Sequence, residues 1–350
     1  METKKYRFDE VTINFDKKRI PLSSAQREKR QGMFRYYGAQ GVIDHVDDYI
    51  FEGTYLLIAE DGENLKSKKQ NIAQVVDGQF WVNNHAHIVQ GNEQCDTQFL
   101  CYLINSMDLS GYITGSAQPK LSQANLNAVT LSLPTLAEQK RIVEYLYMLD
   151  QKIDVNRQIN DNLAVLLQTI YQDRFGNDIL AVNQGVLSDI CSYSRDKVAV
   201  SELNVSTYFS TENMLSEKAG STEATSLPTT SQTTACHKGD TLISNIRPYF
   251  KKIVYCEGNC GCSTDVLCFT PSQPRYSTYL FSTLYADKFF AFMVAGSKGT
   301  KMPRGDKQQI MTYPVVLPSE EELAGFNTIA SPLLKQIYSN RAENKRLSIL

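Results

Sequence analysis

A group of cysteines in the second half of the chain has the residue types of a metal site. Its members are Cys236, Cys256, Cys260, Cys262 and Cys268, with His237 beside the first. Thiolates and imidazoles are the ligands that zinc prefers. The last four cysteines, however, have a C-x3-C-x-C-x5-C spacing that matches no common four-ligand pattern, and their alternation fits strand residues of a hairpin. We therefore expect no metal and no cofactor, and a zinc site stays as the alternative.

Amide and imidazole side chains in the first half of the chain could read the edges of DNA bases. A side chain with two hydrogen-bonding groups can make a bidentate contact with a base edge. The candidates, with two neighbouring tyrosines, are Tyr36, Tyr37, Asn83, Asn84, His85 and Gln118. A structural interpretation is equally open, in which Asn83 and Asn84 cap a turn and His85 fills a core position.

Basic residues cluster near expected turns and could contact DNA phosphates. We select as candidates Arg35, Lys66, Lys68, Lys120, Arg247, Lys251, Lys252, Lys298, Lys301, Arg304 and Lys307. The alternative for each run is an ordinary solvated surface. The run from Lys298 to Lys307 is the most suggestive of DNA binding, because it lies among glycines in the sequence GSKGTKMPRGDK.

Motifs for three kinds of catalysis are absent or doubtful. The sequence has no Walker A motif, which an ATP-driven motor would need. It also lacks the Asn/Asp-Pro-Pro-Tyr/Phe tetrapeptide with which DNA methyltransferases hold a flipped base. Glu-x-Lys elements of metal-dependent nucleases occur only where chance explains them. We expect a non-catalytic protein, and an autonomous zinc-dependent nuclease is the less favoured enzyme.

The elements that would position these residues include an internal repeat. A shift of 184 residues aligns 115–166 with 299–350 without a gap, and twelve of the 52 positions are identical. The matched pairs are Gly115/Gly299, Pro119/Pro303, Leu133/Leu317, Pro134/Pro318, Glu138/Glu322, Leu149/Leu333, Ile153/Ile337, Asn156/Asn340, Arg157/Arg341, Asn160/Asn344, Leu163/Leu347 and Leu166/Leu350. The same shift aligns Lys120 with Arg304, so both copies place a cation after the matched proline.

Each copy of the repeat leads into a long helix. Thr135 with Glu138, and Ser319 with Glu322, have the spacing of a capping box. Apolar residues and asparagines then recur with the 3.5-residue period of a coiled-coil seam. The seam residues that we expect to pair the helices or dock a partner are Leu146, Leu149, Ile153, Asn156, Asn160, Leu163, Ile337, Asn340, Asn344 and Leu347.

The two helices differ in one detail. Gly176 supplies a stop for the first, which at about 35 residues and ~1.5 Å per residue would be roughly 50 Å long and could separate two modules. Pro332 interrupts the seam of the second, and it either begins a new helix after Ser331 or kinks a continuous one. The paired asparagines indicate that the helices pair with each other, because a polar seam residue fixes register or partner.

Before each helix lies a stretch of alternating apolar and polar residues, punctuated by Gly and Asp, that predicts short strands. In the first module the strands are YYGAQGVIDHV, YIFEGTYLLIAEDG and QFWVNNHAHIVQG, with CDTQFLCYLINSMDLSGYI as a helix. In the second they are GDTLISNIRPYFKKIVYC and CSTDVLCFTP, with STYLFSTLYADKFFAFMVAG as a helix. The fold class is therefore α+β, with two mixed modules and two long antiparallel helices.

Composition bounds the class of protein. The 350 residues are long enough for two cores, and 42% hydrophobic with 21% charged residues is typical of globular proteins. The formal net charge of −2 argues against a nonspecific DNA coat, which needs a broadly basic surface. We find neither an apolar signal region at the start nor a membrane-length run, so we expect a cytoplasmic protein with reduced thiols.

These features together resemble the specificity subunits of type I restriction-modification systems, over essentially the whole chain. The most specific segments are TGSAQPKLSQANLNAVTLSLPTLAEQKRIVEYLYMLDQKID, YYGAQGVID and WVNNHAH. The resemblance implies two target recognition domains, 1–133 and 177–317, and two conserved helices, 134–176 and 318–350. Each domain would read one half of a bipartite asymmetric site in double-stranded DNA.

The resemblance also implies partners. The conserved helices would dock two methyltransferase subunits, and restriction and motor subunits would join the full complex. Catalysis would belong to those partners. The alternative from another class is a coiled-coil scaffold that binds only proteins.

Overall fold

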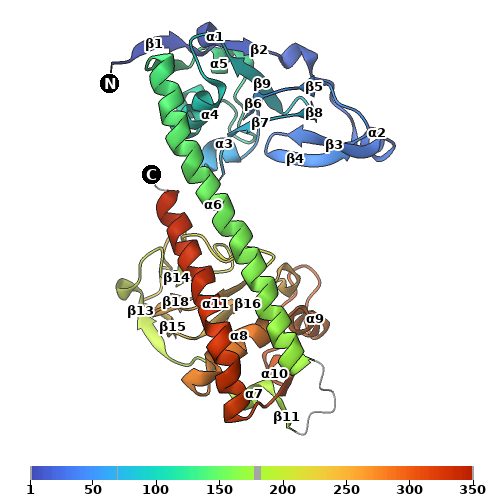
Figure 1. The fold of residues 1–350 in the computed structure, drawn as a ribbon, viewed down its shortest axis with the longest axis vertical. Helices are drawn as coiled ribbons and strands as arrows, with labels where there is room; N and C mark the ends of the chain where they lie inside the picture. The colour runs from blue at the N-terminus through green and yellow to red at the C-terminus, as the bar shows by residue number, and fades with distance from the viewer. Residues whose placement is uncertain (1, 69, 177–182, 349–350) are drawn as a thin grey trace. The chain divides into compact units, whose positions relative to one another are not determined.

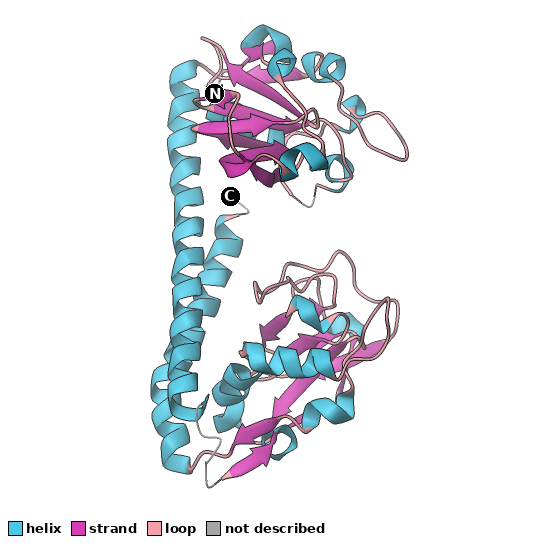
Figure 2. Cartoon of the chain, turned by 90° about the vertical axis from the view of Figure 1, so that its right-hand side faces the viewer, coloured by secondary structure: helices cyan, strands magenta, loops and turns pink. Residues whose placement is uncertain are grey.

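The computed structural model describes residues 2–68, 70–176 and 183–348, in two compact units, Met1–Gln151 (unit 1) and Lys152–Leu350 (unit 2) (Figure 1). Both units mix strands and helices (Figure 2), which confirms the predicted α+β class. Among the helices in these ranges, none is long and apolar enough to cross a membrane.

Unit 1 contains three small sheets. The first has the order β2-β9-β6-β7, and its strands are β2 (Thr12–Asn14), β9 (Ala86–Gly91), β6 (Tyr55–Ala59) and β7 (Ala73–Val76). The second has the order β4-β3-β8-β5, with β4 (Gly41–Val46), β3 (Gln31–Gly38), β8 (Gln79–Val82) and β5 (Phe51–Glu52). The third pairs β1 (Lys4–Arg7) with β10 (Thr130–Leu133).

The core of unit 1 forms where helix α4 (Thr97–Ser106) covers the first sheet. Asp96 caps this helix by accepting a hydrogen bond from the Phe99 N–H at 2.9 Å. Leu100 and Ile104, four residues apart on one helix face, are fully buried in the same cluster as Ile58 of β6. The short helices α1 (Phe8–Val11), α2 (Ser24–Glu28), α3 (Asn64–Ser67) and α5 (Gln123–Asn127) lie in the connections.

Unit 2 also contains three sheets. The first has the order β12-β19-β16-β17, with β12 (Cys191–Tyr193), β19 (Val266–Pro271), β16 (Thr241–Ser244) and β17 (Ile253–Tyr255). The second has the order β13-β15-β18-β14, with β13 (Lys197–Ala199), β15 (Gln232–Cys236), β18 (Cys260–Cys262) and β14 (Tyr208–Phe209). The third pairs β11 (Gln184–Val186) with β20 (Pro314–Val316).

Two elements of unit 2 are broken where the sequence predicts continuity. The segment expected as one strand divides into β16 and β17 around the 3-10 turn η5 (Pro248–Phe250), because Arg247 is left-handed and Pro248 has no N–H to give to a sheet. The expected helix divides into α8 (Ser277–Tyr285) and α9 (Asp287–Ala295) at Ala286, whose backbone is extended. Its apolar pattern continues across the break, so periodicity alone could not locate it. The short helices α7 (Leu187–Ile190) and α10 (Lys307–Met311) complete the unit.

The two long helices begin where the sequence predicts. Helix α6 (Leu136–Tyr171) follows Thr135, whose hydroxyl and N–H exchange hydrogen bonds with Glu138, and ends in the π-helical turn η3 (Gln172–Gly176). Helix α11 (Glu320–Leu347) has the capping box of Ser319 and Glu322. Both predicted capping boxes are therefore confirmed. Helix α11 runs through Pro332, so this proline does not begin a separate helix.

Helices α6 and α11 lie side by side and antiparallel in unit 2 (Figure 1). The Asn156 Nδ2 donates to the Asn344 Oδ1 at 2.8 Å, and the Asn340 Nδ2 donates to the Asn160 Oδ1 at 2.9 Å. The Asn344 Nδ2 also donates to the Ile153 carbonyl at 3.1 Å. Buried amides of the seam are thus paired with each other, as buried polar groups require.

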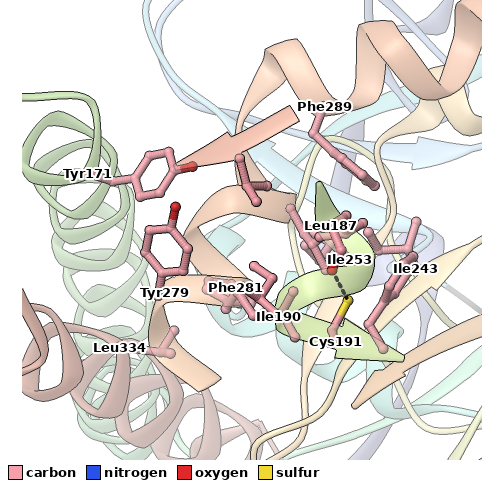
Figure 3. Close-up of a cluster of buried hydrophobic side chains, with 14 of the residues drawn as sticks. Tyr171, Leu187, Ile190, Cys191, Ile243, Ile253, Tyr279, Phe281, Phe289 and Leu334 are labelled. Carbon is pink, nitrogen blue, oxygen red and sulfur yellow. Dashed lines mark hydrogen bonds between the residues drawn. The ribbon is translucent and has the colours of Figure 1, made fainter. Parts of the chain in front are cut away.

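The core of unit 2 joins these helices to the first sheet. Figure 3 shows Tyr171 of α6, Tyr279 of α8 and Leu334 of α11 on one side of the cluster, with Leu187 and Ile243 on the other. The Tyr171 and Tyr279 rings lie 5.7 Å apart, which is a favourable separation for aromatic pairs. Unit 2 therefore has a core of its own, to which both long helices contribute.

Candidate nucleic-acid interface

In unit 1, three loops meet at the end of strand β6. The Glu60 N–H donates to the His85 carbonyl at 2.9 Å, and the Gly62 N–H donates to the Pro119 carbonyl at 3.1 Å. The Leu121 N–H closes the arrangement by donating to the Glu60 carbonyl at 2.8 Å. We call residues 60–62, 83–85 and 115–120 the unit 1 loop cluster.

The loop that carries Lys120 has a tight backbone. Thr114 and Lys120 exchange two backbone hydrogen bonds of 2.8 Å, which close the loop at its base. Gly115 has φ +84°, and a Cβ on it would lie 2.3 Å from the Gln118 carbonyl oxygen. Only glycine fits such a position, which gives the repeated Gly115/Gly299 match a physical reason.

In unit 2, three loops meet at the end of strand β16 through equivalent hydrogen bonds. The Asn245 N–H donates to the Asp265 carbonyl at 2.8 Å, and the Arg247 N–H donates to the Pro303 carbonyl at 2.7 Å. The Gly305 N–H donates to the Asn245 carbonyl at 3.3 Å, and Lys298 and Arg304 close their loop with bonds of 2.9 and 3.0 Å. We call residues 245–247, 263–265 and 299–304 the unit 2 loop cluster.

Each loop cluster holds its cation with a carboxylate. In unit 1, the Lys120 Nζ lies 3.2 Å from Glu60, which also binds Arg19 at 2.9 Å. Burial alone would raise the pKa of Glu60, but Arg19, His87 and Lys120 outweigh it and hold the pKa below its usual value. Glu60 is therefore ionised and neutralises part of the positive charge that Lys120 presents.

In unit 2, Arg304 is held in the same way from a different position. Its guanidinium lies 3.0 Å from Asp265, and both side chains are about half exposed. Lys298 contacts Asp306 at 2.6 Å, and this contact raises the pKa of Lys298 and lowers that of Asp306. Lys301 and Lys307 are exposed. Ion pairs this exposed are weak, so the cations remain free to exchange a carboxylate for a phosphate.

Beneath the unit 1 loop cluster lies a buried ion pair. The His87 Nδ1 is 2.6 Å from Asp16, and its Nε2 is 2.8 Å from the Leu121 carbonyl. Burial raises the pKa of Asp16, but the hydrogen bond and charge of His87, the Ile88 N–H and Arg19 lower it more, so the net shift is downward. Both His87 ring nitrogens therefore lie within hydrogen-bond distance of an oxygen atom.

The structure brings some of the sequence candidates together in these clusters. Asn83, Asn84, His85, Gln118 and Lys120 lie in the unit 1 loop cluster, and Arg247, Lys301 and Arg304 in the unit 2 loop cluster, with Lys298 and Lys307 adjacent. The Asn83 side chain accepts from the His85 N–H at 2.8 Å, and the His85 Nδ1 pairs with Asp61 at 2.7 Å. Asn84 and Gln118 are exposed.

Other candidates have structural partners elsewhere. Tyr36 is fully buried and its hydroxyl accepts from the Leu22 N–H at 2.8 Å, while Tyr37 packs edge-on against Phe80. Arg35 is exposed and lies over the Tyr37 ring.

Four of the candidate lysines also have partners. Lys66 donates to the Gly115 carbonyl at 3.0 Å, and Lys68 to the Met107 carbonyl at the same distance. Lys251 pairs with Asp287 at 3.0 Å. Lys252 donates to the Thr211 carbonyl at 2.7 Å, and burial lowers its pKa. All four lysines therefore brace their own unit.

Sequence reasoning missed the residues that hold the candidates. Glu60, Asp61 and Asp265 pair with Lys120, His85 and Arg304, and no local pattern marked them. His87 is paired with Asp16, 71 residues away along the chain. A partner at that separation has no spacing signal in a single sequence.

Five of the six cysteines of unit 2 pack together as free thiols. Cys236, Cys256, Cys260, Cys262 and Cys268 belong to one buried cluster with Leu242 and Val254. The Cys256 and Cys260 sulfurs are 3.5 Å apart. Across the described ranges, no group of three or more His, Cys, Asp or Glu side chains has an arrangement that could hold a metal ion.

Comparison with known proteins finds relatives of part of the chain. A family model described as the type I restriction modification DNA specificity domain matches residues 2–164. A protein of Haemophilus influenzae named as a type I restriction enzyme specificity subunit is 36% identical over 138 residues, and the EcoprrI specificity subunit of Escherichia coli is 25% identical over 125. These alignments cover 39% and 36% of this chain but only 35% and 30% of the relatives.

A solved structure shares the fold over the whole chain. The S subunit of the type I restriction-modification system from M. genitalium superposes with a TM-score of 0.61 at 13% sequence identity, and covers 100% of this chain and 94% of that one. At this identity the similarity shows the fold alone. The family match, over residues 2–164, supports the resemblance that the sequence indicated.

Proposed function

We propose that this chain is the DNA-recognition subunit of a type I restriction-modification complex and is not itself catalytic. The observation that carries the proposal is the shared construction of the two loop clusters. In each unit, equivalent backbone hydrogen bonds attach the loop to the end of a core strand, and the loop presents an exposed cation after a proline. Cations on a fixed loop position a protein on the DNA backbone, while neighbouring side chains read bases.

Reading a bipartite site requires two recognition modules of common design. Equivalent strands support an internal repeat: β2-β9-β6-β7 has the same order as β12-β19-β16-β17, and β1/β10 the same pairing as β11/β20. In the remaining sheets, β3 pairs parallel with β8 as β14 does with β18. We propose target recognition domains at 1–133 and 177–317, followed by conserved helices at 134–176 and 318–350. Two parts of these ranges, 177–182 and 349–350, lie outside the described residues.

The helix seam supports the same proposal. The 184-residue shift aligns Asn156 with Asn340 and Asn160 with Asn344. Asn156 hydrogen-bonds to Asn344, the counterpart of Asn160, and Asn340 hydrogen-bonds to Asn160. Such a crossed pairing is typical of an interface with a two-fold axis. We propose that the seam holds the two conserved helices in a fixed register.

A second face of helix α6 suits a partner. Val155, Ile159 and Leu166 are 40–47% exposed and lie away from the seam. In the described residues a large part of their apolar surface stays exposed, and exposed apolar patches mark interaction sites. We propose that methyltransferase subunits dock along this helix, and that restriction and motor subunits join through them.

The decisive experiment maps methylated bases in cells that contain the chain and an active methyltransferase partner. A gapped two-part motif that disappears when the gene is deleted would support the proposal. An unchanged methylation map in the deletion strain would refute it. If the chain were instead a scaffold that binds only proteins, the affinity of the complex for DNA would not fall as the salt concentration rises.

Single substitutions sharpen this test. Lys120→Ala should reduce methylation of every site that contains the motif, because the loop cation contacts phosphate and carries no sequence information. Lys335→Ala, an exposed lysine of α11, is the matched control and should leave the map unchanged.

A further inference from the structure

The turn between β16 and β17 in unit 2 has an unusual composition. Arg247, Pro248, Tyr249, Phe250 and Lys251 form η5 and its two flanking residues. The turn presents its aromatic side chains to solvent: Tyr249 is 46% exposed and Phe250 is 37% exposed. Their ring centroids are 4.7 Å apart. Among the tyrosines and phenylalanines in the described ranges, only Tyr145 and Tyr147, both on α6, are comparably exposed.

Backbone strain is concentrated at this turn. Arg247 and Lys251 both have φ +50°, and the segment against which the turn packs contains Glu217 and Lys218 at φ +52° and +62°. The Glu217 N–H donates to the Phe250 carbonyl at 2.9 Å, and the Lys218 N–H to the Lys251 carbonyl at 3.0 Å. In the parts of the chain that the structure describes, Lys68 is the one other non-glycine residue with positive φ. Left-handed non-glycine residues are costly, and they cluster at functional sites.

The strained turn adjoins the candidate DNA surface. Arg247 belongs to the unit 2 loop cluster, since its N–H binds the Pro303 carbonyl at 2.7 Å, next to Arg304. Arg247 and Lys251 flank the two rings along the chain, and Lys251 pairs with Asp287 at 3.0 Å and with Glu217 at 4.0 Å. An aromatic pair that is rigid, exposed and bordered by cations suits a polyanion with apolar faces, which is a description of DNA.

We propose that Tyr249 and Phe250 form an aromatic wedge that contacts the bases of the DNA half-site read by unit 2. This inference rests on the proposed function and adds to it the residues that read bases in unit 2. Apolar side chains of DNA-binding proteins insert at base steps or contact thymine methyl groups, and the wedge would act in one of these ways. The loop cations would contact the phosphates on either side of it.

The corresponding segment of unit 1, 62–72, contains no aromatic residue in its sequence. The position that corresponds to Arg247 is Gly62, whose N–H binds the Pro119 carbonyl at 3.1 Å. Helix α3 follows, with Asn64 and Leu65 buried. The wedge should therefore affect only one half of the bipartite site, and the other half serves as an internal control in every experiment.

The first experiment maps methylation with Tyr249→Ala and Phe250→Ala in the complete complex. Each variant should lower the methylation rate at the motif about tenfold, because one base–aromatic stack contributes roughly that factor. Each variant should also methylate sites that carry any base at one or two adjacent positions of one half-site. Tyr249→Phe retains the ring and should restore the wild-type map. Lys335→Ala, the exposed α11 control used above, should leave both the methylation rate and the motif unchanged.

The outcomes separate the two proposals. If the wild-type complex produces no gapped motif, the proposed function fails. If the wild type produces one and both alanine variants give the same motif at the same rate, the wedge fails while the function stands. Because both rings are exposed, the variants should unfold at the wild-type temperature, and a melting curve checks this directly.

A second measurement detects the contact itself. The mapped half-site is synthesised with 2-aminopurine at each purine in turn, other than the methylated base. Binding of the wild-type complex should raise the fluorescence at one base step, and Tyr249→Ala should abolish that rise. An equal fluorescence signal from wild type and Tyr249→Ala at every step would overturn insertion of this ring between bases, and contact with a thymine methyl group is then decided by the methylation map.

Discussion

A single buried residue, His87, helps to hold the unit 1 loop cluster in place. Its imidazole connects Asp16 to the carbonyl of Leu121, the residue that follows Lys120. A buried ion pair of this kind contributes little net free energy when intact, yet removal of one partner leaves an uncompensated charge. The position of the Lys120 loop therefore depends on a carboxylate more than one hundred residues earlier in the chain.

We expect Asp16→Asn to lower the free energy of unfolding of unit 1 by about 3 kcal/mol, the usual cost of breaking a buried pair. The measurement is urea unfolding followed by the fluorescence of Trp81, the one tryptophan of the chain, which lies buried in unit 1. Asp9→Asn breaks the exposed pair with Arg7 and should cost less than about 1 kcal/mol. Equal losses in both variants would contradict this account.

The same pair predicts a pH dependence. The folded-state pKa of Asp16 lies below its ordinary value of 3.8, so folding favours the ionised carboxylate. Its contribution to stability is complete well above pH 3.8 and is lost as the pH falls through the folded-state pKa. The difference between wild type and Asp16→Asn should therefore shrink below about pH 4 in acid titrations monitored by Trp81 fluorescence. A constant difference down to pH 2 would show that Asp16 does not titrate there.

The loop cations make a separate prediction about salt. Arg304→Ala should weaken DNA binding of the complete complex equally for all sequences, and should reduce the slope of log affinity against log salt by about 1. Lys120→Ala should behave in the same way. Fluorescence anisotropy at several salt concentrations provides the measurement, with Lys335→Ala as the control. A changed motif with an unchanged slope would identify Arg304 as a base reader.

At the scale of elements, the seam between α6 and α11 combines apolar packing with paired amides. Ile153 and Ile337 are buried beside the asparagines, and Gln336 donates to the Asn340 Oδ1 at 2.7 Å. Asn160 is 8% exposed, so its amide has little access to water. The hydrogen bond that Asn340 donates is thus the main compensation for burying the Asn160 Oδ1.

Asn340→Ala should destabilise unit 2 by about 1–3 kcal/mol, because it leaves the Asn160 amide buried without its partner. The double variant Asn160→Leu with Asn340→Leu should recover that loss, since neither polar group remains. Urea unfolding followed by far-UV circular dichroism measures both. Asn162→Ala on the exposed face of α6 is the control, with an expected effect within about 0.5 kcal/mol. A double variant less stable than the single would show that the amides do more than satisfy each other.

At the scale of the whole molecule, the buried hydrophobic clusters of the described residues divide between the two units, and none contains residues of both. Tyr36, Phe80 and Ile88 are buried in unit 1, and Tyr279, Phe289 and Phe326 in unit 2. Cores without shared residues can unfold separately, in which case one free energy does not describe the chain.

We therefore expect two transitions in urea. Asp16→Asn should move the transition seen by Trp81 fluorescence, and Asn340→Ala should move the remaining transition seen by circular dichroism. Each variant should leave the other transition in place. If either substitution shifts both transitions equally, the units unfold as one cooperative body.

Sequence alone predicted the features that depend on local spacing. The capping boxes at Thr135 and Ser319 follow from residues three apart, and the α+β class follows from strand and helix periods. The break at Ala286 was not predictable, because the apolar pattern continues through it. The paired carboxylates Glu60 and Asp265 were missed, because only the folded chain brings them to Lys120 and Arg304.

The loop clusters have a consequence for how the recognition specificity can change. The hydrogen bonds that attach each loop come from backbone groups, apart from the glycine that the tight turn requires. Side chains at 116–118 and 300–302 project from this frame without holding it together. If the proposed function holds, mutation there would alter the DNA sequence that is read at little cost to folding, so descendants of one scaffold would acquire new targets by a few substitutions.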